Sequence, residues 1–162
     1  MKQYIAIIIL TLCLVSCSHH SKHWETLISV EPIMEERPDS ALAVLQSIEI
    51  GDLSSKEEKG KRALLLSIAL DKNEIRQTDF EILDPAIDYY KENGSSTEQM
   101  LTLFYQGQIH RINSQYAQAL TCFCDAIKIS DAPSNIHTIA RVYDAQGDVY
   151  KSLAKWNETI KS

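Results

Sequence analysis

The sequence predicts an all-α fold made of antiparallel helical hairpins, and three observations support this prediction. Apolar side chains recur at helical spacing in residues 101–112 and again in residues 116–129, which indicates two amphipathic helices. Only residues 113–115 separate the two helices, and so short a connection requires an antiparallel turn. Five glycines and four prolines argue against long disordered regions, and the absence of alternating stretches bounded by turns argues against a sheet.

Residues 1–16 have the features of a secretory signal peptide. Lys2 is the only charge among them, and an apolar run over residues 4–15 is too short to span a bilayer as a mature helix. The run ends in Leu-Val-Ser-Cys at residues 14–17, which resembles the lipobox of bacterial lipoproteins. This resemblance implies cleavage before Cys17 and attachment of acyl chains such as palmitate to that residue. An ordinary signal peptide with an incidental cysteine is the alternative.

Residues 17–23 are expected to form a flexible lipidated tether between the membrane and the fold. The three histidines in this segment are an alternative metal site, but a solvated tether is the favoured interpretation. Lipoproteins that Gram-negative gut bacteria export to the cell surface often carry an acidic run after the acylated cysteine, and this chain has none. The resemblance therefore implies a protein of the cell envelope, anchored to the inner or outer membrane and facing the periplasm.

Residues 24–162 are expected to form one helical repeat domain. Apolar residues at helical spacing predict a first helix from Trp24 to about Glu36. Pro38 suits the first position of the next helix, which is expected to end near Ile48.

The next helix is predicted to be the most buried one. Ser54 and Ser55 lie three residues before Glu57 and Glu58, which gives two overlapping capping boxes. The helix that they introduce is apolar on nearly all sides over residues 63–70, so we expect neighbours on both sides of it.

Caps and helix breakers define the remaining elements. Pro85 either kinks a helix or begins a new one with Asp84 as its cap. Gly94 is expected to close that helix, and Ser96 to open the helix that contains residues 101–112. Ser134 is expected to cap the last helix.

The hairpin at residues 101–129 resembles the tetratricopeptide repeat, a 34-residue helix-turn-helix unit with a Gly-x-x-Tyr step and an Ala-x-x-x-Phe step. Parts of the pattern recur, and the alanine positions are 45, 33 and 40 residues apart. The connection at residues 71–77 is longer than the turn of the family. The residues that carry the pattern are Ala41, Ala86, Tyr90, Gly107, Tyr116, Ala119, Phe123, Ala126, Gly147, Tyr150 and Trp156.

The resemblance implies a right-handed stack of about three to four irregular repeats, which is a tetratricopeptide-like α-solenoid. The last repeat is expected to be incomplete, with its second helix starting near Trp156. We therefore expect a fragment, a truncated reading frame or an unusually short member of the family. The phrase at residues 37–42, Arg-Pro-Asp-Ser-Ala-Leu, resembles the opening of many repeat lipoproteins and sensor proteins of Gram-negative gut bacteria.

The sequence offers few groups for catalysis. It has no Gly-rich phosphate loop, His-Glu-x-x-His or Gly-x-Ser-x-Gly motif, and its formal charge of −6 does not suit nucleic acid. Cys122 and Cys124 point to different sides of a helix, so packing is favoured over a metal or redox site. His110 and His137 are solitary on helices. We expect no enzyme, no cofactor and no metal.

The resemblance implies a binding protein, because first helices of successive repeats line a groove for a peptide in that family. The function expected is that of a lipid-anchored periplasmic scaffold, with a short peptide of one hydrophobic anchor as ligand. The alternative is the sensory part of a longer membrane signalling or transcription-regulating protein, and a cryptic hydrolase is a third possibility. The candidate groove residues are Leu101, Phe104, Gln108, Arg111, Arg141, Asp144, Asp148 and Lys151.

Overall fold

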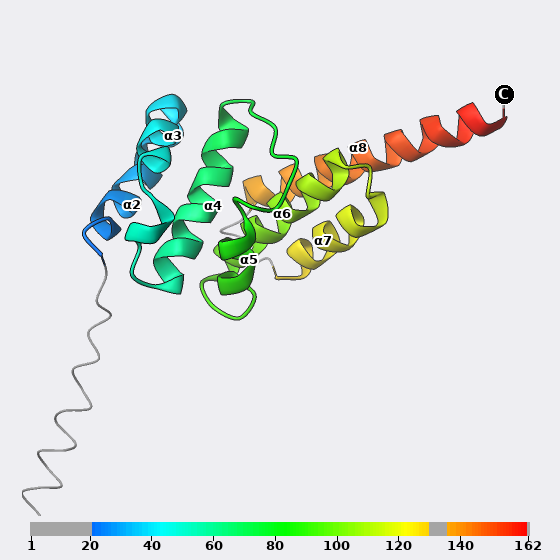
Figure 1. Ribbon diagram of the computed structural model, residues 1–162. Helices are drawn as coiled ribbons and strands as arrows, with labels where there is room; N and C mark the ends of the chain where they lie inside the picture. The colour runs from blue at the N-terminus through cyan, green and yellow to red at the C-terminus, as the bar shows by residue number, and fades with distance from the viewer. Residues whose placement is uncertain (1–20, 130–135, 162) are drawn as a thin grey trace, which may run out of the picture.

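The computed structural model describes residues 21–129 and 136–161, and it contains helices but no strand within those ranges (Figure 1). The all-α prediction is confirmed. The signal peptide, Cys17, the first part of the tether and Ser134 lie outside the described residues. The elements are α2 (Trp24–Val30), η1 (Glu31–Ile33), α3 (Pro38–Gln46), η2 (Ile50–Asp52), α4 (Lys56–Lys72), α5 (Asp84–Tyr90), α6 (Ser96–Ile112), α7 (Tyr116–Ile129) and α8 (Ile136–Lys161).

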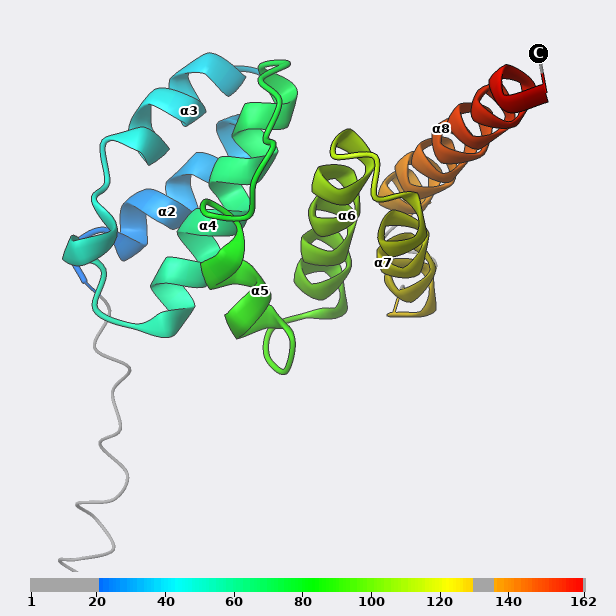
Figure 2. The same ribbon diagram turned by 45° about the vertical axis from the view of Figure 1, so that its right-hand side comes forward.

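Helices α4, α6 and α8 lie side by side, with α6 in the middle (Figure 2). Helix α5 packs against α4 and α6, and α7 packs against α6 and α8. The pair formed by α6 and α7 is the most extensive helix contact in the described part of the chain. At the other end, α2 and α3 both pack against α4. The hairpin predicted for residues 101–129 is therefore present, and its first helix is central.

Side-chain caps place the starts of two long helices. Ser55 has an extended backbone, and its Oγ accepts a hydrogen bond of 3.1 Å from the Glu58 amide. Ser95 makes a reciprocal capping box with Glu98, at 3.3 Å from the Glu98 amide to Ser95 Oγ and 2.9 Å from the Ser95 amide to Glu98 Oε2. The cap expected at Ser96 is thus wrong by one residue, because Ser95 has the glutamate three positions later that completes the box.

Pro85 marks a helix start, which is one of the two alternatives that the sequence left open. Helix α5 begins at Asp84 and carries Pro85 in its first turn, where a missing N–H costs no helical hydrogen bond. Leu83 occupies the cap position in place of Asp84. The helix ends at Tyr90, and Gly94 follows with a φ of +78°, a backbone conformation that side chains with a Cβ rarely adopt.

The core is divided into two clusters of buried apolar side chains, which the half-buried Ile68 of α4 joins. One cluster fills the space between α4, α5, α6, α7 and α8, and the other lies between α2, α3 and α4. Members of the first include Leu83, Tyr90, Met100, Phe104, Ile109, Phe123, Val142 and Val149. Members of the second include Leu27, Val30, Leu42, Leu45, Ile48, Leu65 and Leu70.

Gly107 is required where α6 meets α7. A Cβ built on Gly107 would lie 2.5 Å from Cε1 and 2.7 Å from Cδ1 of the Phe123 ring. Phe123 is fully buried, so its ring has no open space into which to move. The other repeat positions of this region are also buried, namely Ala86, Tyr90, Ala119 and Ala126, and so is Ala41 in the second cluster.

The turn expected before Trp156 does not form, since α8 continues as a single helix to Lys161 (Figure 1). Residues 151–155, Lys-Ser-Leu-Ala-Lys, contain no glycine, proline or asparagine that would favour a turn. Without a second helix, Gly147 faces open space and Tyr150 is 60 % exposed.

Candidate binding groove

Two adjoining hollows form a groove along α6. The first, of about 280 Å³, lies between α4, α6 and α8, and the second, of about 630 Å³, extends under the connection that follows α4. Asp71, Gln108 and Arg111 line both hollows and so join them. The groove thus uses three helices that are adjacent in space and separated in sequence.

Six of the eight candidate groove residues line the first hollow, namely Phe104, Gln108, Arg111, Arg141, Asp144 and Asp148. Lys151 lies at its edge, with Nζ 3.3 Å from Asp148 Oδ1. Leu101 does not belong to the same hollow. It lines a separate one, with Lys61 and Glu98, on the side of α6 that faces α4. Leu101 shares a helix face with Phe104 and Gln108 but lies near the start of α6, so it is displaced from the first hollow along the helix axis.

Arg141 closes the floor of the groove by joining α8 to α4 across α6. Its Nη2 lies 2.5 Å from Asp71 Oδ2 and 3.3 Å from the Tyr105 hydroxyl, which itself donates to Asp71 Oδ2 at 3.3 Å. The guanidinium carbon lies 4.6 Å from the centre of the Phe104 ring, in a cation–π contact. These contacts tie α4, α6 and α8 together.

This arrangement removes the hydrophobic anchor that the sequence suggested. Phe104 is only 1 % exposed, because its ring is covered by Arg141 and packs against Phe123 at 6.1 Å between ring centres. Leu101, the other half of the expected apolar pair, lies elsewhere. The surface that remains for a ligand is charged and polar.

The pKa values of Arg141 and Tyr105 keep Arg141 charged and Tyr105 neutral near neutral pH. Burial raises the pKa of Tyr105 to about 12, with Arg141 opposing this rise and Asp71 adding to it. For Arg141, burial alone would lower the pKa, but contacts with Tyr105 and Asp71 outweigh burial and raise it. Neither group is suited to donate or accept a proton near neutral pH. The contacts of Arg141 with Asp71 and Tyr105 therefore hold helices in position.

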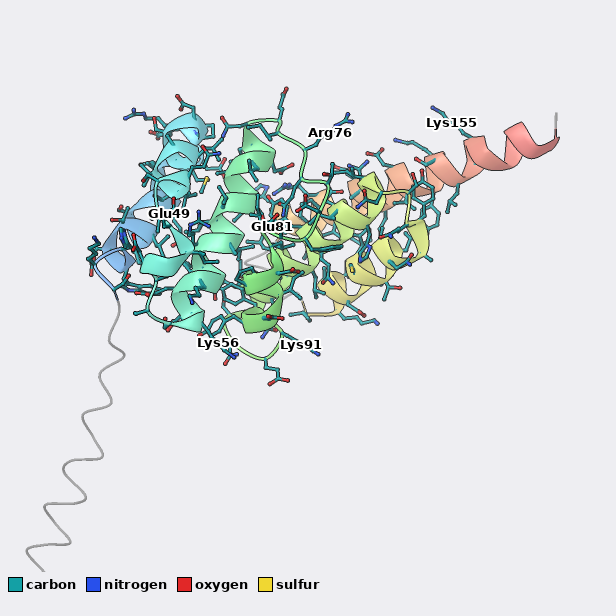
Figure 3. All side chains as sticks on the ribbon, in the orientation of Figure 1. Glu49, Lys56, Arg76, Glu81, Lys91 and Lys155 are labelled. Carbon is teal, nitrogen blue, oxygen red and sulfur yellow. The ribbon has the colours of Figure 1, made fainter. Side chains whose placement is uncertain are left out.

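Arg111 is a cation that lines both hollows of the groove. Its Nε donates to Gln108 Oε1 at 2.8 Å, and no carboxylate of the described residues forms an ion pair with it. Arg76 projects from the connection after α4 beside the larger hollow (Figure 3). Asp144 and Asp148 supply negative charge at the other end. Glu74 also lines the larger hollow, so charges of both signs occur along the whole groove.

Sequence reasoning missed the contribution of residues 71–77. Asp71, Glu74, Ile75, Arg76 and Gln77 line the larger hollow together with Tyr105. The signal that would have found them is the length of this connection, which exceeds the turn of the family. Long connections beside a rigid scaffold commonly carry binding residues.

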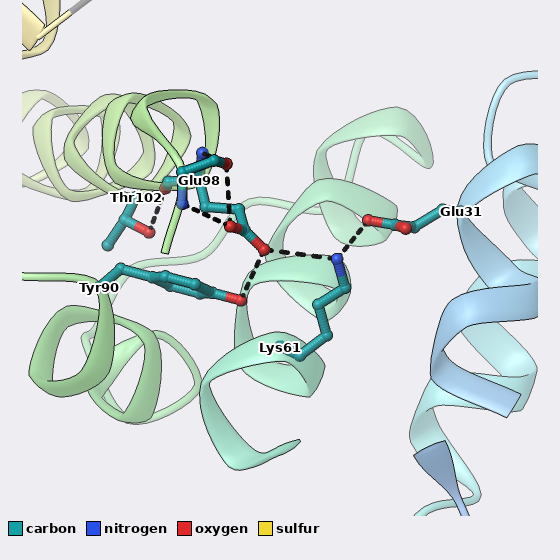
Figure 4. Close-up of polar contacts among 6 residues, drawn as sticks. Glu31, Lys61, Tyr90, Glu98 and Thr102 are labelled. Carbon is teal, nitrogen blue, oxygen red and sulfur yellow. Dashed lines mark hydrogen bonds and ion pairs between the residues drawn. The ribbon is translucent and has the colours of Figure 1, made fainter. Parts of the chain in front are cut away.

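A second polar cluster, between η1, α4, α5 and α6, is structural (Figure 4). Lys61 Nζ lies 2.6 Å from Glu31 Oε1 and 3.5 Å from Glu98 Oε1, and the Tyr90 hydroxyl donates to Glu98 at 3.2 Å. Burial would raise the pKa of Glu98, but bonds from Ser95 and the charge of Lys61 outweigh it and lower the pKa. The Glu98 carboxylate already accepts from Lys61, Tyr90 and Ser95, so it is not available to a substrate. This cluster therefore joins helices.

The rest of the described chain adds no reactive centre. No group of three or more His, Cys, Asp or Glu side chains within it is placed to hold a metal ion, and none of its helices has the length and apolarity needed to cross a membrane. Cys122 is buried and Cys124 exposed, as their spacing predicted, and burial raises the pKa of Cys122 to about 11. No protein-family model, curated protein or solved structure matches this chain. Its function has to be inferred from the groove.

Proposed function

We propose that this chain is a lipid-anchored binding protein of the cell envelope that holds an extended peptide segment of a partner protein along α6. The observation that carries the proposal is the groove itself, in which Arg111, a cation without an ion pair, lies between the carboxylates of α8 and a connection of mixed charge. The stacked helical hairpins would act as a tetratricopeptide-like scaffold, with α4, α6 and α8 as the helices that face the ligand. Binding without catalysis fits side chains that are engaged in structural contacts.

The ligand is a peptide of mixed charge. Arg111 and Arg76 suit carboxylates, because a guanidinium offers several N–H donors in a plane. Asp144 and Asp148 suit a lysine or arginine at the other end of the groove. Since Phe104 is covered, affinity rests on charge and on backbone hydrogen bonds. We therefore expect binding to weaken as salt is added.

The test of the groove uses peptides that are selected from a displayed library for binding to the full chain. Changing Arg111→Ala together with Asp148→Ala is expected to weaken the selected peptides at least about tenfold, because both charged ends lose a partner. Calorimetry or fluorescence anisotropy measures the affinity. The matched control is Arg37→Ala with Asp88→Ala, which removes one charge of each sign from exposed positions on α3 and α5. Unchanged affinity in the groove variant would show that peptides bind elsewhere.

The anchor has an independent test. The protein purified from host membranes is expected to have the mass of a chain beginning at Cys17 plus its acyl chains, because several acyl chains are needed for stable anchoring. The variant Cys17→Ala is expected to lose the acyl mass and to leave the membrane fraction. A parent protein that retains residues 1–16, or that carries no acyl chain, would contradict the lipid anchor without affecting the groove.

A further inference from the structure

Helix α8 carries an apolar stripe that no part of the described structure covers. The stripe consists of Ile136, Ala140, Tyr143, Gly147, Tyr150 and Ala154, spaced by alternating steps of four and three residues, which keeps them on one helix face. Ile136, Tyr143 and Tyr150 are 64 %, 56 % and 60 % exposed. The opposite face of α8 is buried in the core through Val142, Ala145 and Val149. The stripe is therefore a second apolar face on a helix that is already anchored.

The same chain shows how such a face is used. On α6, Gly107 lies forty residues before Gly147, and the Phe123 ring of α7 packs directly against it. A Cβ on Gly107 would clash with that ring, whereas a Cβ on Gly147 would meet nothing within 4 Å. A small residue at the centre of an apolar stripe lets a second helix approach closely. The stripe on α8 therefore resembles the face of α6 that packs against α7.

We propose that the stripe is an interface between two copies of this chain, with the two α8 helices antiparallel and Gly147 at the two-fold axis. In a two-fold pair, each residue before the axis meets the residue an equal distance after it in the other copy. Tyr143 lies four residues before Gly147 and Tyr150 three after it, so each tyrosine lies within one residue, about 1.5 Å along the helix, of the position opposite the other tyrosine of the second copy. Ala140 and Ala154 lie seven residues on either side and also meet each other.

Charge at the edge of the stripe is complementary in the same register. Asp144 lies three residues before Gly147 and Lys151 four after it, and both are exposed on the same edge of the stripe. Antiparallel pairing therefore places Asp144 of one copy beside Lys151 of the other, twice in the dimer. Lys151 now lies 3.3 Å from Asp148 of its own helix, but both side chains of that pair are largely in solvent. In a parallel two-fold pair, the edge that carries Asp144 and Lys151 would face the opposite edge of the other copy, so this charge pairing would not form.

Geometry leaves room for the second copy. Helix α8 extends beyond α7 in both views, so its outer part stands away from the rest of the fold (Figures 1 and 2). One helix pair is a small interface, which predicts reversible association in solution. Anchoring in a membrane would raise the local concentration and favour the dimer.

The first measurement is the mass of the full chain by sedimentation equilibrium in density-matched neutral detergent, over a range of concentrations. We expect the mass to rise from one chain to two chains. The variant Tyr143→Glu with Tyr150→Glu is expected to remain at one chain, because it buries charges of one sign against each other. The control Ile50→Glu changes an isoleucine that is 47 % exposed on η2, and it should dimerise as the parent does. A parent at one chain throughout, or a tyrosine variant that still dimerises, would overturn the proposal.

Cross-linking tests the register. In a Cys124→Ser background, Gly147→Cys is expected to give a covalent dimer on mild oxidation, and the same background with Gly147 intact is not. Lys155→Cys is expected to give none, because the antiparallel pair separates the two sites by about 24 Å along the helix. Equal cross-linking at both sites would establish a parallel pair and overturn the two-fold register. A cross-link to a protein of another mass in host membranes would assign the stripe to a different partner and also overturn the proposal.

Discussion

Replacing Phe123 with alanine is expected to lower the free energy of unfolding by about 3–5 kcal/mol, as is typical of a fully buried phenylalanine. Its ring is 0 % exposed, touches Gly107 and packs against Phe104, so the change opens a cavity between α6 and α7. These helices form the most extensive contact in the described structure and cannot close the gap without moving α8. Urea denaturation followed by circular dichroism measures the loss. A loss below about 1 kcal/mol would show that the site collapses around the change.

A double-mutant cycle tests the contact with Gly107 directly. Gly107→Ala alone is expected to destabilise by about 1–3 kcal/mol, because its Cβ would lie 2.5 Å from the Phe123 ring. In the Phe123→Ala background the ring is absent, and the same change is expected to stabilise through the higher helix propensity of alanine, by up to about 1 kcal/mol. Gly147→Ala is the matched control, because its Cβ meets nothing within 4 Å. Equal effects of Gly107→Ala in both backgrounds would rule out the contact.

Replacing Glu58 with alanine is expected to cost about 1–3 kcal/mol, because the Ser21 amide and the amide and hydroxyl of Ser54 lose a charged acceptor. Glu58 is 0 % exposed, and its carboxylate accepts hydrogen bonds from the Ser54 amide at 2.6 Å, from Ser54 Oγ at 2.9 Å and from the Ser21 amide. It therefore holds the start of the described chain and the start of α4 together. Chemical denaturation at neutral pH measures the effect.

The same residue makes stability fall in acid. Burial alone would raise the pKa of Glu58, but hydrogen bonds from Ser21 and Ser54 outweigh it and lower the pKa below the ordinary value of 4.5. The unfolded chain therefore takes up the proton first, and the stabilisation is complete above about pH 4.5 and is lost as the pH falls through the lowered folded value. Glu58→Gln is expected to be less stable at pH 7 and less sensitive to acid. If Glu58→Gln lost as much stability on acidification as the parent, the assignment would be wrong, with Glu98 carrying the dependence instead.

Local patterns were enough to predict most of the fold. Helical spacing of apolar residues located α6 and α7, and Pro38 and Pro85 marked helix starts. The end of α8 was mispredicted because the repeat pattern implied a turn that residues 151–155 do not favour. The shift from Ser96 to Ser95 arose because two serines adjoin and only the complete box distinguishes them.

The groove was harder to predict than the helices. Six residues that spacing on α6 and α8 singled out line one hollow, since residues three and four apart share a helix face. The cover that Arg141 forms over Phe104 was not predicted, because it depends on Asp71, which is 70 positions away in the chain. No local pattern encodes a partner at such a distance.

That separation also determines the order in which the molecule can assemble. Contacts within hairpins join residues close in sequence, so the loop entropy lost in forming them is small and they are expected to form rapidly. The bond between Arg141 and Asp71 closes a loop of 70 residues and requires both α6 and α8 to be in place. We expect it to form late in folding, so it should slow unfolding more than it speeds folding. A newly made chain would therefore have the pair formed by α6 and α7 before it has the groove, and the groove would be complete only when α8 docks.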